Sequence, residues 1–307
     1  MTKQLHILNG FATYHLFKEA GIAGDVCVWD EILSEGPCTY HIANDNFWKV
    51  RSDFVSQTFG RAASEYETVI EHFSRIRAFE QYEELVLWYE YDLFCQVNLM
   101  ALLSWLYSAK AYNKAKIHLI CVGKESGYDQ LVGLGQLPVR KYPELLENRI
   151  ELSESCLAYA DDIWSAYAGD DPRELVAATI PHPVFTYLSD AIQAHFKRFP
   201  DQSGLNEIEK ELLSYIGQHQ PLKLDQLVRH MLQWQHYYGF GDLQYYVYIK
   251  KLGDLVAFES GTLSLTDQGA MALKDGIDRQ QYPDLNLTLG GSTTSLFYRN
   301  GTTLYPS

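Results

Sequence analysis

The hydrophobic pattern at the start of the chain alternates between short apolar runs and longer segments with helical spacing. The apolar runs predict four strands, at residues 5–8, 26–29, 85–89 and 116–123. The segments between them predict helices, at residues 13–21, 45–80 and 93–109. Continuously apolar strands that alternate with helices are typical of a parallel sheet covered on both faces. We therefore predict an N-terminal α/β domain, Rossmann-like and with a mostly parallel sheet, over residues 1–126.

The pattern changes after this domain, where apolar strands give way to helical spacing. We predict a helical segment over residues 127–203 that packs on the first domain. Residues 204–307 then show three helical patterns and two short strands separated by Ser260-Gly261, followed by a turn-rich tail. Three helices followed by a β-hairpin are typical of a winged helix. This last part is therefore predicted to be a winged-helix-like α+β unit with a β-rich tail.

Composition and charge narrow the class of protein. The chain of 307 residues is 47% hydrophobic and carries a net charge of −14, which disfavours attraction to nucleic acid and to anionic membranes. Its five cysteines are odd in number and none is in a C-x-x-C motif, so we expect reduced thiols. No apolar stretch approaches the roughly 20 residues of a membrane span, and no signal-peptide pattern precedes the first strand. We therefore expect a cytoplasmic protein that has no membrane segment.

Polar side chains gather where the predicted parallel strands end. The groups in question are Asn9-Gly10 after the first strand, Trp29-Asp30-Glu31 and Glu35 after the second, and Trp88, Glu90, Asp92 and Gln96 at and beyond the end of the third. Ligands of parallel sheets bind at the carboxyl ends of the strands, and neighbouring strands lie about 4.8 Å apart. We therefore expect these side chains to converge on one site.

Converging carboxylates suit two kinds of chemistry. Asp30, Glu90 and Asp92 are candidate ligands of Mg²⁺, which binds carboxylate oxygens together with water and substrate phosphates. Glu31 or Glu35 is the candidate acid or base, because like charges held together raise one pKa. The other candidates would orient or line a ligand: Asn9, Gly10, Trp29, Trp88 and Gln96.

The acidic residues other than Glu90 also have a purely structural alternative. Asp92 directly precedes an apolar helical pattern, where an aspartate commonly acts as the helix cap. Glu35-Gly36-Pro37 has the composition of a turn. The acidic pair that follows Trp29 has the alternative of salt bridges to Arg51 or Arg61. The sequence leaves both interpretations open.

Several motifs that would define other functions are missing. The histidines show no H-x-x-x-H or H-E-x-x-H spacing and no G-x-S-x-G occurs, which argues against a zinc hydrolase and a serine hydrolase. Asn9-Gly10 precedes a helical pattern and could receive an anion, but it lacks the spacing of known phosphate-binding loops. Residues 204–275 are net acidic and rich in tyrosine. DNA binding is therefore disfavoured, and protein contact is favoured.

These residues together resemble a bacterial family, the one known as domain of unknown function 1835. The motifs that carry the resemblance are residues 5–10, Trp29-Asp30-Glu31, Glu35-Gly36-Pro37, residues 87–93 and Gln96. The likeness covers roughly residues 4–125 and continues through residues 133–137 into the C-terminal unit. The residues that match the family pattern are Asn9, Gly10, Asp30, Glu31, Glu35, Glu90, Asp92 and Gln96. The chain departs from it at Phe11, Tyr91 and Cys95, where relatives have Asp, His and Asp.

Three functions follow as hypotheses. The first is an enzyme or ligand-binding protein that acts on a phosphorylated or nucleotide-like small molecule at the strand ends, with Mg²⁺ as a possible cofactor. The alternative is a non-catalytic sensor or adaptor that contacts a protein partner, or a second copy of itself, through residues 204–307. A DNA-binding regulator is the least favoured.

Overall fold

The structure is a computed structural model that describes residues 3–307. Its largest sheet has five strands in the order β2-β1-β4-β5-β6. Four of them are mutually parallel: β1 (Gln4–Leu8), β2 (Asp25–Val28), β4 (Glu84–Glu90) and β5 (Lys116–Val122). The edge strand β6 (Ile150–Glu151) pairs antiparallel with β5. The predicted mostly parallel sheet is confirmed. β6 was not expected, because it is too short to leave a hydrophobic pattern.

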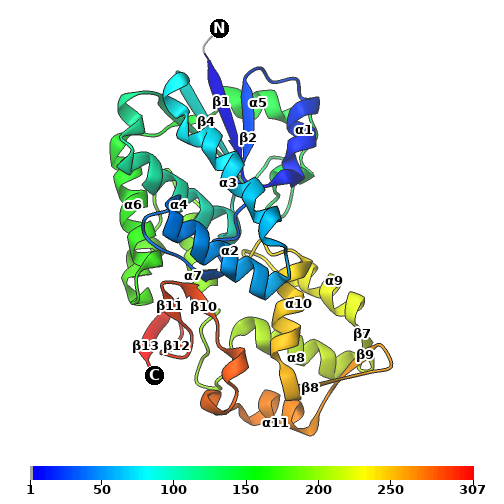
Figure 1. The fold of residues 1–307 in the computed structure, drawn as a ribbon. Helices are drawn as coiled ribbons and strands as arrows, with labels where there is room; N and C mark the ends of the chain where they lie inside the picture. The colour runs from blue at the N-terminus through cyan, green and yellow to red at the C-terminus, as the bar shows by residue number, and fades with distance from the viewer. Residues whose placement is uncertain (1–2) are drawn as a thin grey trace.

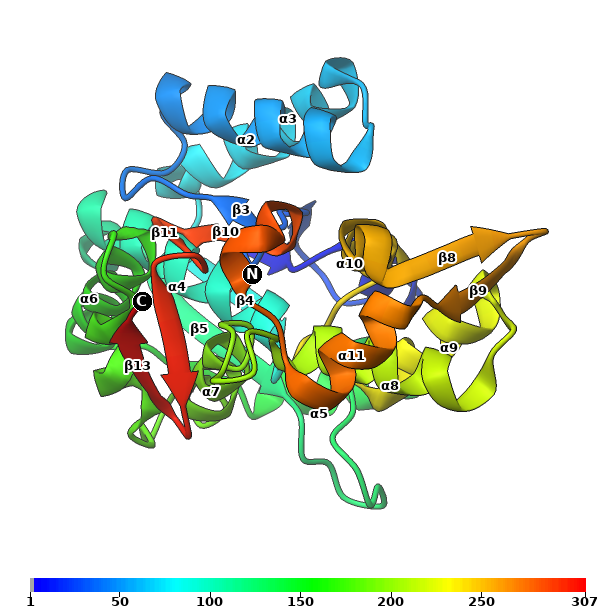
Figure 2. The ribbon, with the colours of Figure 1, turned by 90° about the horizontal axis from the view of Figure 1, so that it is seen from below.

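Helices cover both faces of this sheet. On one face lie α2 (Asp45–Phe59), α3 (Ala63–Arg77) and α4 (Leu93–Ser108); on the other lie α1 (Tyr14–Glu19) and α5 (Lys141–Glu147). Leu87 belongs to the core on the first face, and its neighbour Trp88 packs with Phe17 and Tyr142 on the second. Successive strand residues point to opposite faces, which explains why both are buried. Figure 2 shows α2 and α3 on one side of the strands and α5 on the other.

Helix α4 is the centre of the fold. It packs against β4 on one side and against α6 (Glu154–Ala168) on the other, so that most of its residues are buried. The helical segment adds a 3-10 helix, η5 (Pro172–Thr179), and α7 (Leu188–Phe196), which also contacts α4. Within residues 3–307 no helix combines the length and the apolar character needed to cross a membrane.

The C-terminal unit contains the predicted three helices and hairpin. Its elements are α8 (Glu207–His219), β7 (Leu222–Lys223), α9 (Leu224–Trp234), α10 (Asp242–Lys251), β8 (Val256–Glu259), β9 (Thr262–Leu265) and α11 (Asp267–Asp275). The strand β7 joins the hairpin as a third strand, in the order β7-β9-β8. Figure 1 shows this unit below the main sheet. Its identification as a winged helix stays a prediction.

The C-terminal tail returns to the N-terminal half. The tail forms β10 (Thr288–Gly290), β11 (Ser292–Thr293), β12 (Phe297–Asn300) and β13 (Thr303–Pro306). Strand β10 pairs in parallel with β3, which is Gly36–Pro37. Gly36 has φ of +74° and faces the ring of Phe54, so a side chain would not fit there. The segment that has the composition of a turn is thus a short strand that the tail covers.

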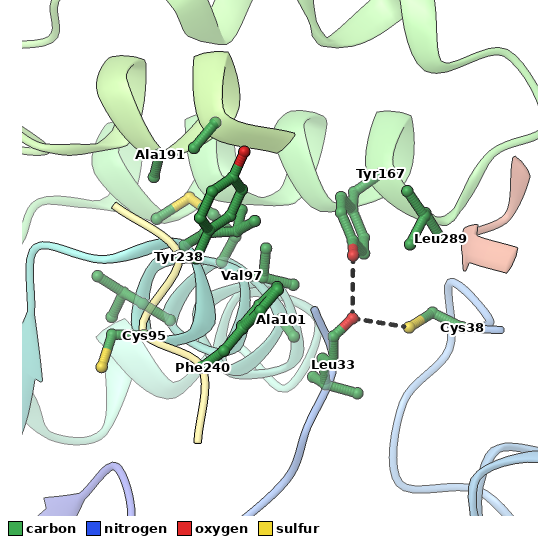
Figure 3. Close-up of a cluster of buried hydrophobic side chains, with 14 of the residues drawn as sticks. Leu33, Cys38, Cys95, Val97, Ala101, Tyr167, Ala191, Tyr238, Phe240 and Leu289 are labelled. Carbon is green, nitrogen blue, oxygen red and sulfur yellow. Dashed lines mark hydrogen bonds between the residues drawn. The ribbon is translucent and has the colours of Figure 1, made fainter. Parts of the chain in front are cut away.

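The predicted units share one hydrophobic core. Figure 3 shows Tyr238 and Phe240, from the loop before α10, in one cluster with Val97 and Ala101 of α4. Next to them, the Tyr167 hydroxyl of α6 donates a hydrogen bond of 3.0 Å to the carbonyl oxygen of Leu33. Side chains from the sheet, the helical segment and the C-terminal unit are therefore packed together, and each segment helps to hold the loops at the strand ends.

Candidate functional site

The candidate residues lie at the carboxyl edge of the parallel strands, but they separate into three groups. Glu90 and Asp92 come together with Cys95 at the start of α4. Asp30 lies beside the turn at Gly10. The remaining acids, Glu31 and Glu35, are buried in ion pairs.

The first group is a compact set of three potential ligand atoms. One oxygen each from Glu90 and Asp92 and the sulfur of Cys95 all lie within 4.8 Å of one another. Asp92 Oδ1 accepts a hydrogen bond of 2.8 Å from the backbone N–H of Cys95, which confirms the helix-capping role considered for Asp92. Glu90 Oε1 accepts one of 2.8 Å from the backbone N–H of Leu134. Asp30 is not a member of this set.

Burial dominates the electrostatics of these two carboxyls. It raises the pKa of Glu90 to about 7, and the negative charge of Asp92 adds to the increase. Burial also raises the pKa of Asp92, although the N–H of Cys95 opposes it. Two carboxyls held together in a low dielectric resist double ionisation. Glu90 is therefore the group at this edge that can both give and take a proton near neutral pH.

Two loops close over this group. Gly133 lies against the Glu90 carboxylate and Gly239 against that of Asp92, and a side chain at either position would collide with the acid. The loop before α10 also satisfies the first turn of α4. The N–H of Leu93 donates to Tyr237 O at 2.7 Å, and that of Phe94 to Tyr238 O at 3.2 Å. The donors of this helix terminus are thus taken by the protein.

Asp30 is the more open acid. It follows β2 directly, is only partly exposed, and its Oδ1 lies 3.7 Å from the position that a Cβ on Gly10 would occupy. Burial raises its pKa, and the positive charge of Arg61 opposes this increase. Gly10 has φ of +100°, a conformation that L-residues rarely adopt, so the turn after β1 requires glycine.

Glu31 and Glu35 hold the loop that leads from β2 to β3. Glu31 Oε1 accepts from Arg51 Nη2 at 2.9 Å, and its other oxygen accepts from the hydroxyl of Tyr66, so the salt bridge considered for Arg51 is confirmed. Glu35 pairs with Arg198 at 2.6 Å. All four charged side chains are buried. Because each carboxylate is paired with an arginine, the geometry favours a structural role for Glu31 and Glu35 over acid–base catalysis.

A network of amides connects the strand ends. Asn9 donates to the sulfur of Cys95 at 3.0 Å, and Asn98 donates to Asn9 Oδ1 at 2.8 Å and to Glu31 O at 2.6 Å. Gln96 donates to Glu90 O at 2.7 Å. Asn98 was not among the candidates, although an asparagine in an otherwise apolar helix was a signal that could have found it.

The two tryptophans belong to the core. Trp29 and Trp88 are fully buried on opposite faces of the sheet. Trp88 Nε1 donates to His6 Nδ1 at 3.2 Å, and its ring stacks on Tyr142. An aromatic side chain that is open at this edge is Phe11, which is 47% exposed. The tryptophans thus support the site from within, and Phe11 is an aromatic group that a ligand can reach.

The fold and this edge define an α/β protein with a polar site at the ends of its parallel strands. No protein-family model and no curated protein matches the chain. Its resemblance to the family of domain of unknown function 1835 therefore stays a prediction, and the function must be argued from the site itself.

Proposed function

We propose that this chain binds a phosphorylated or nucleotide-like small molecule at the carboxyl ends of β1 and β2, with Asp30 as the group that recognises it. The observation that carries the proposal is the position of Asp30 beside Gly10. In nucleotide-binding parallel sheets, an acid at the end of the second strand, roughly 20 residues after the first glycine turn, bonds the ribose hydroxyls. Asp30 stands in this relation to Gly10.

The surroundings of Asp30 support a ligand of this class. Two adjacent hydroxyls of a sugar can donate to one carboxylate, and the glycine turn lets them approach the backbone. Phe11 offers a ring face for a base to stack on, because it is exposed and its ring lies 5.5 Å from that of His72. The positive charge of Arg61 near Asp30 favours a phosphate group on the ligand.

Binding should depend on the charge of Asp30. Adenosine, AMP and ATP are each titrated into the protein, and the melting temperature and Kd are measured. We expect at least one of them to raise the melting temperature, and Asp30→Asn to weaken its binding about 10-fold to 100-fold, since a hydrogen bond to a charged group contributes about 1.5–3 kcal/mol. The exposed Glu147 on α5 provides the control, and Glu147→Gln should bind as the wild type does. Equal binding by Asp30→Asn, or no binding by the wild type, would contradict the proposal.

Mg²⁺ forms the second arm of the same experiment. If the ligand brings Mg²⁺ to the carboxylates, the rise in melting temperature with ATP is larger with Mg²⁺ than with EDTA, and Asp30→Asn combined with Glu90→Gln removes the difference. A ligand bound equally well in both buffers leaves the recognition by Asp30 intact and removes Mg²⁺ from the proposal.

A second candidate function is contact with another copy of the chain through the C-terminal unit, which the sequence predicts to be winged-helix-like. An apolar groove of about 350 Å³ runs between α10 and the β8–β9 hairpin. Phe258 and Tyr246 line it, and Phe258 is 61% exposed. Apolar side chains grouped in a surface groove are typical of contact surfaces.

Light scattering of the full chain over a range of concentrations tests this second function. We expect the wild type to self-associate and Phe258→Asp to shift it to monomer, because a charge in the groove would have to be desolvated on contact. Met271→Asp, on the exposed side of α11, is the matched control and should behave as the wild type. A wild type that remains monomeric at every concentration would exclude the contact.

A further inference from the structure

The start of α4 brings three metal-binding side chains together for a local reason. An N-cap side chain reaches forward to the N–H of the third helical residue. Asp92 is the cap of α4 and Cys95 provides that N–H, so their side chains lie next to each other. Glu90 is the last residue of β4, only two positions before the cap, and its carboxylate completes the group.

Each carboxylate in this group has one oxygen engaged by the protein. Glu90 Oε1 accepts from Leu134 N–H, and Asp92 Oδ1 accepts from Cys95 N–H. Among residues 3–307, the second oxygen of neither carboxylate is buried without a partner. Two ligands of one zinc ion, bonded at 2.0–2.3 Å, lie at most about 4.6 Å apart. Because the three ligand atoms already lie within 4.8 Å of one another, small side-chain rotations bring them to a common ion.

A separate observation points to an occupant. The side chain of Gln96 is 1% exposed, and its Oε1 is buried with no hydrogen-bond partner among residues 3–307. Its amide nitrogen donates to Glu90 O, and its backbone N–H donates to Asp92 O at 2.8 Å. The unsatisfied oxygen is on the same amide group as the nitrogen that bonds Glu90 O, so it lies beside the strand end that carries Glu90. A buried amide oxygen without a partner is unfavourable, and a cation would remove that cost.

We propose that Glu90, Asp92 and Cys95, with Gln96 as a fourth donor, form a site for a thiophilic divalent cation such as Zn²⁺ or Co²⁺. The sulfur of Cys95 determines which metal ions can bind. Mg²⁺ takes oxygen ligands and keeps several waters, whereas Zn²⁺ and Co²⁺ accept thiolate together with carboxylate. The site differs from the Mg²⁺ site predicted at Asp30, Glu90 and Asp92, and it does not depend on a ligand at Asp30.

Binding requires the thiol to lose its proton. Burial raises the pKa of Cys95 well above its ordinary value, and the charges of the two acids add to the increase. A metal ion reverses this balance, because it takes the place of the proton on sulfur and compensates the negative charges. Each bound ion thus releases the thiol proton to solvent, together with any proton shared by the carboxyls. Affinity is therefore expected to rise with pH.

Cobalt is the probe that reports the sulfur directly. The full chain is stripped with a chelator and titrated with Co²⁺ while its absorption is recorded. We expect one ion per chain and a thiolate-to-cobalt charge-transfer band in the near ultraviolet. Cys95→Ser should abolish the band and weaken Co²⁺ binding by about 10-fold or more. Cys156→Ser, on α6, is the matched control and should keep both.

Three outcomes would overturn the proposal: no stoichiometric Co²⁺ binding, an unchanged band in Cys95→Ser, or displacement of Co²⁺ by Mg²⁺ at equal concentration. If Cys95→Ser does not fold, Glu90→Gln serves instead: it should keep the band and weaken binding, and an unchanged affinity would contradict the proposal. Loss of Co²⁺ binding with nucleotide binding intact would overturn the metal site alone, since Asp30 is outside it.

Discussion

Replacing Arg198 with methionine is expected to lower the free energy of unfolding by about 3–5 kcal/mol. The guanidinium is fully buried and bonds three groups in two separate parts of the chain. It donates to Glu35 Oε1 and to Ser34 O, both at 2.6 Å, and to the Tyr248 hydroxyl at 3.0 Å. Methionine fills a similar volume but leaves the Glu35 carboxylate buried without a partner, which is the costly way to break a buried ion pair. Urea unfolding at neutral pH measures the loss.

The double variant separates the lost charge from the lost packing. Arg198→Met combined with Glu35→Met should recover most of the stability, because two well-packed apolar side chains often replace a buried ion pair without cost. Arg140→Met, at an exposed arginine, is the control and should change the free energy of unfolding by less than about 0.5 kcal/mol. A loss in Arg198→Met no larger than that of the control would show that the pair does not hold the units together.

The features that were predicted correctly are those with a local cause. The apolar runs that became β1, β2, β4 and β5 are continuous because both faces of the sheet are covered. The cap at Asp92 follows from an aspartate directly before an apolar helix. The salt bridge from Arg51 to Glu31 was one of two considered, and α2 places the arginine above the loop. Each of these depends on residues no more than 20 positions apart or on one repeating pattern.

The features that were missed are contacts between distant segments. Nothing in the sequence near Glu35 indicates that Arg198 is its partner, because the pairing depends on how α7 lies against α4. The same holds for Tyr237, whose carbonyl accepts from the first N–H of α4. These contacts decide which acids are available. Arginines from α2 and from the residues just after α7 take Glu31 and Glu35 out of the candidate site, whereas the carboxylate of Asp30 stays partly exposed.

Cys95 illustrates the limit of interpreting one position by itself. In the sequence it counted as a departure from the family pattern and as one of five ordinary thiols. In the structure its sulfur lies within reach of two acids and accepts from Asn9. Helix capping and the end of β4 bring about this arrangement together, and neither of them is visible from the cysteine alone. The candidate metal site therefore combines a strand-end acid, a helix cap and a thiol, which the sequence alone does not connect.

Acid is expected to destabilise the protein through His195 of α7. Burial, together with the charge of Arg198, lowers the pKa of this imidazole to about 3, and its Nδ1 has no hydrogen-bond partner among residues 3–307. In the unfolded chain the pKa returns to about 6.5, so below that pH the unfolded state binds a proton that the folded state does not. Stability is fully present above about pH 6.5 and falls by about 1.4 kcal/mol per pH unit as the pH decreases toward 3.

Substitution isolates this contribution from the other groups that titrate in acid. Between about pH 6.5 and pH 4.5 the wild type should lose roughly 2–3 kcal/mol more stability than His195→Leu, measured by urea unfolding at both pH values. Leucine remains apolar in a pocket formed with Tyr167 and Phe199, so the variant should fold at neutral pH. His236→Leu, at an exposed histidine, should follow the wild type. If His195→Leu and the wild type lost equal stability in acid, the imidazole would have to be protonated in the folded protein, and the pocket around it would have to accommodate a second charge next to Arg198.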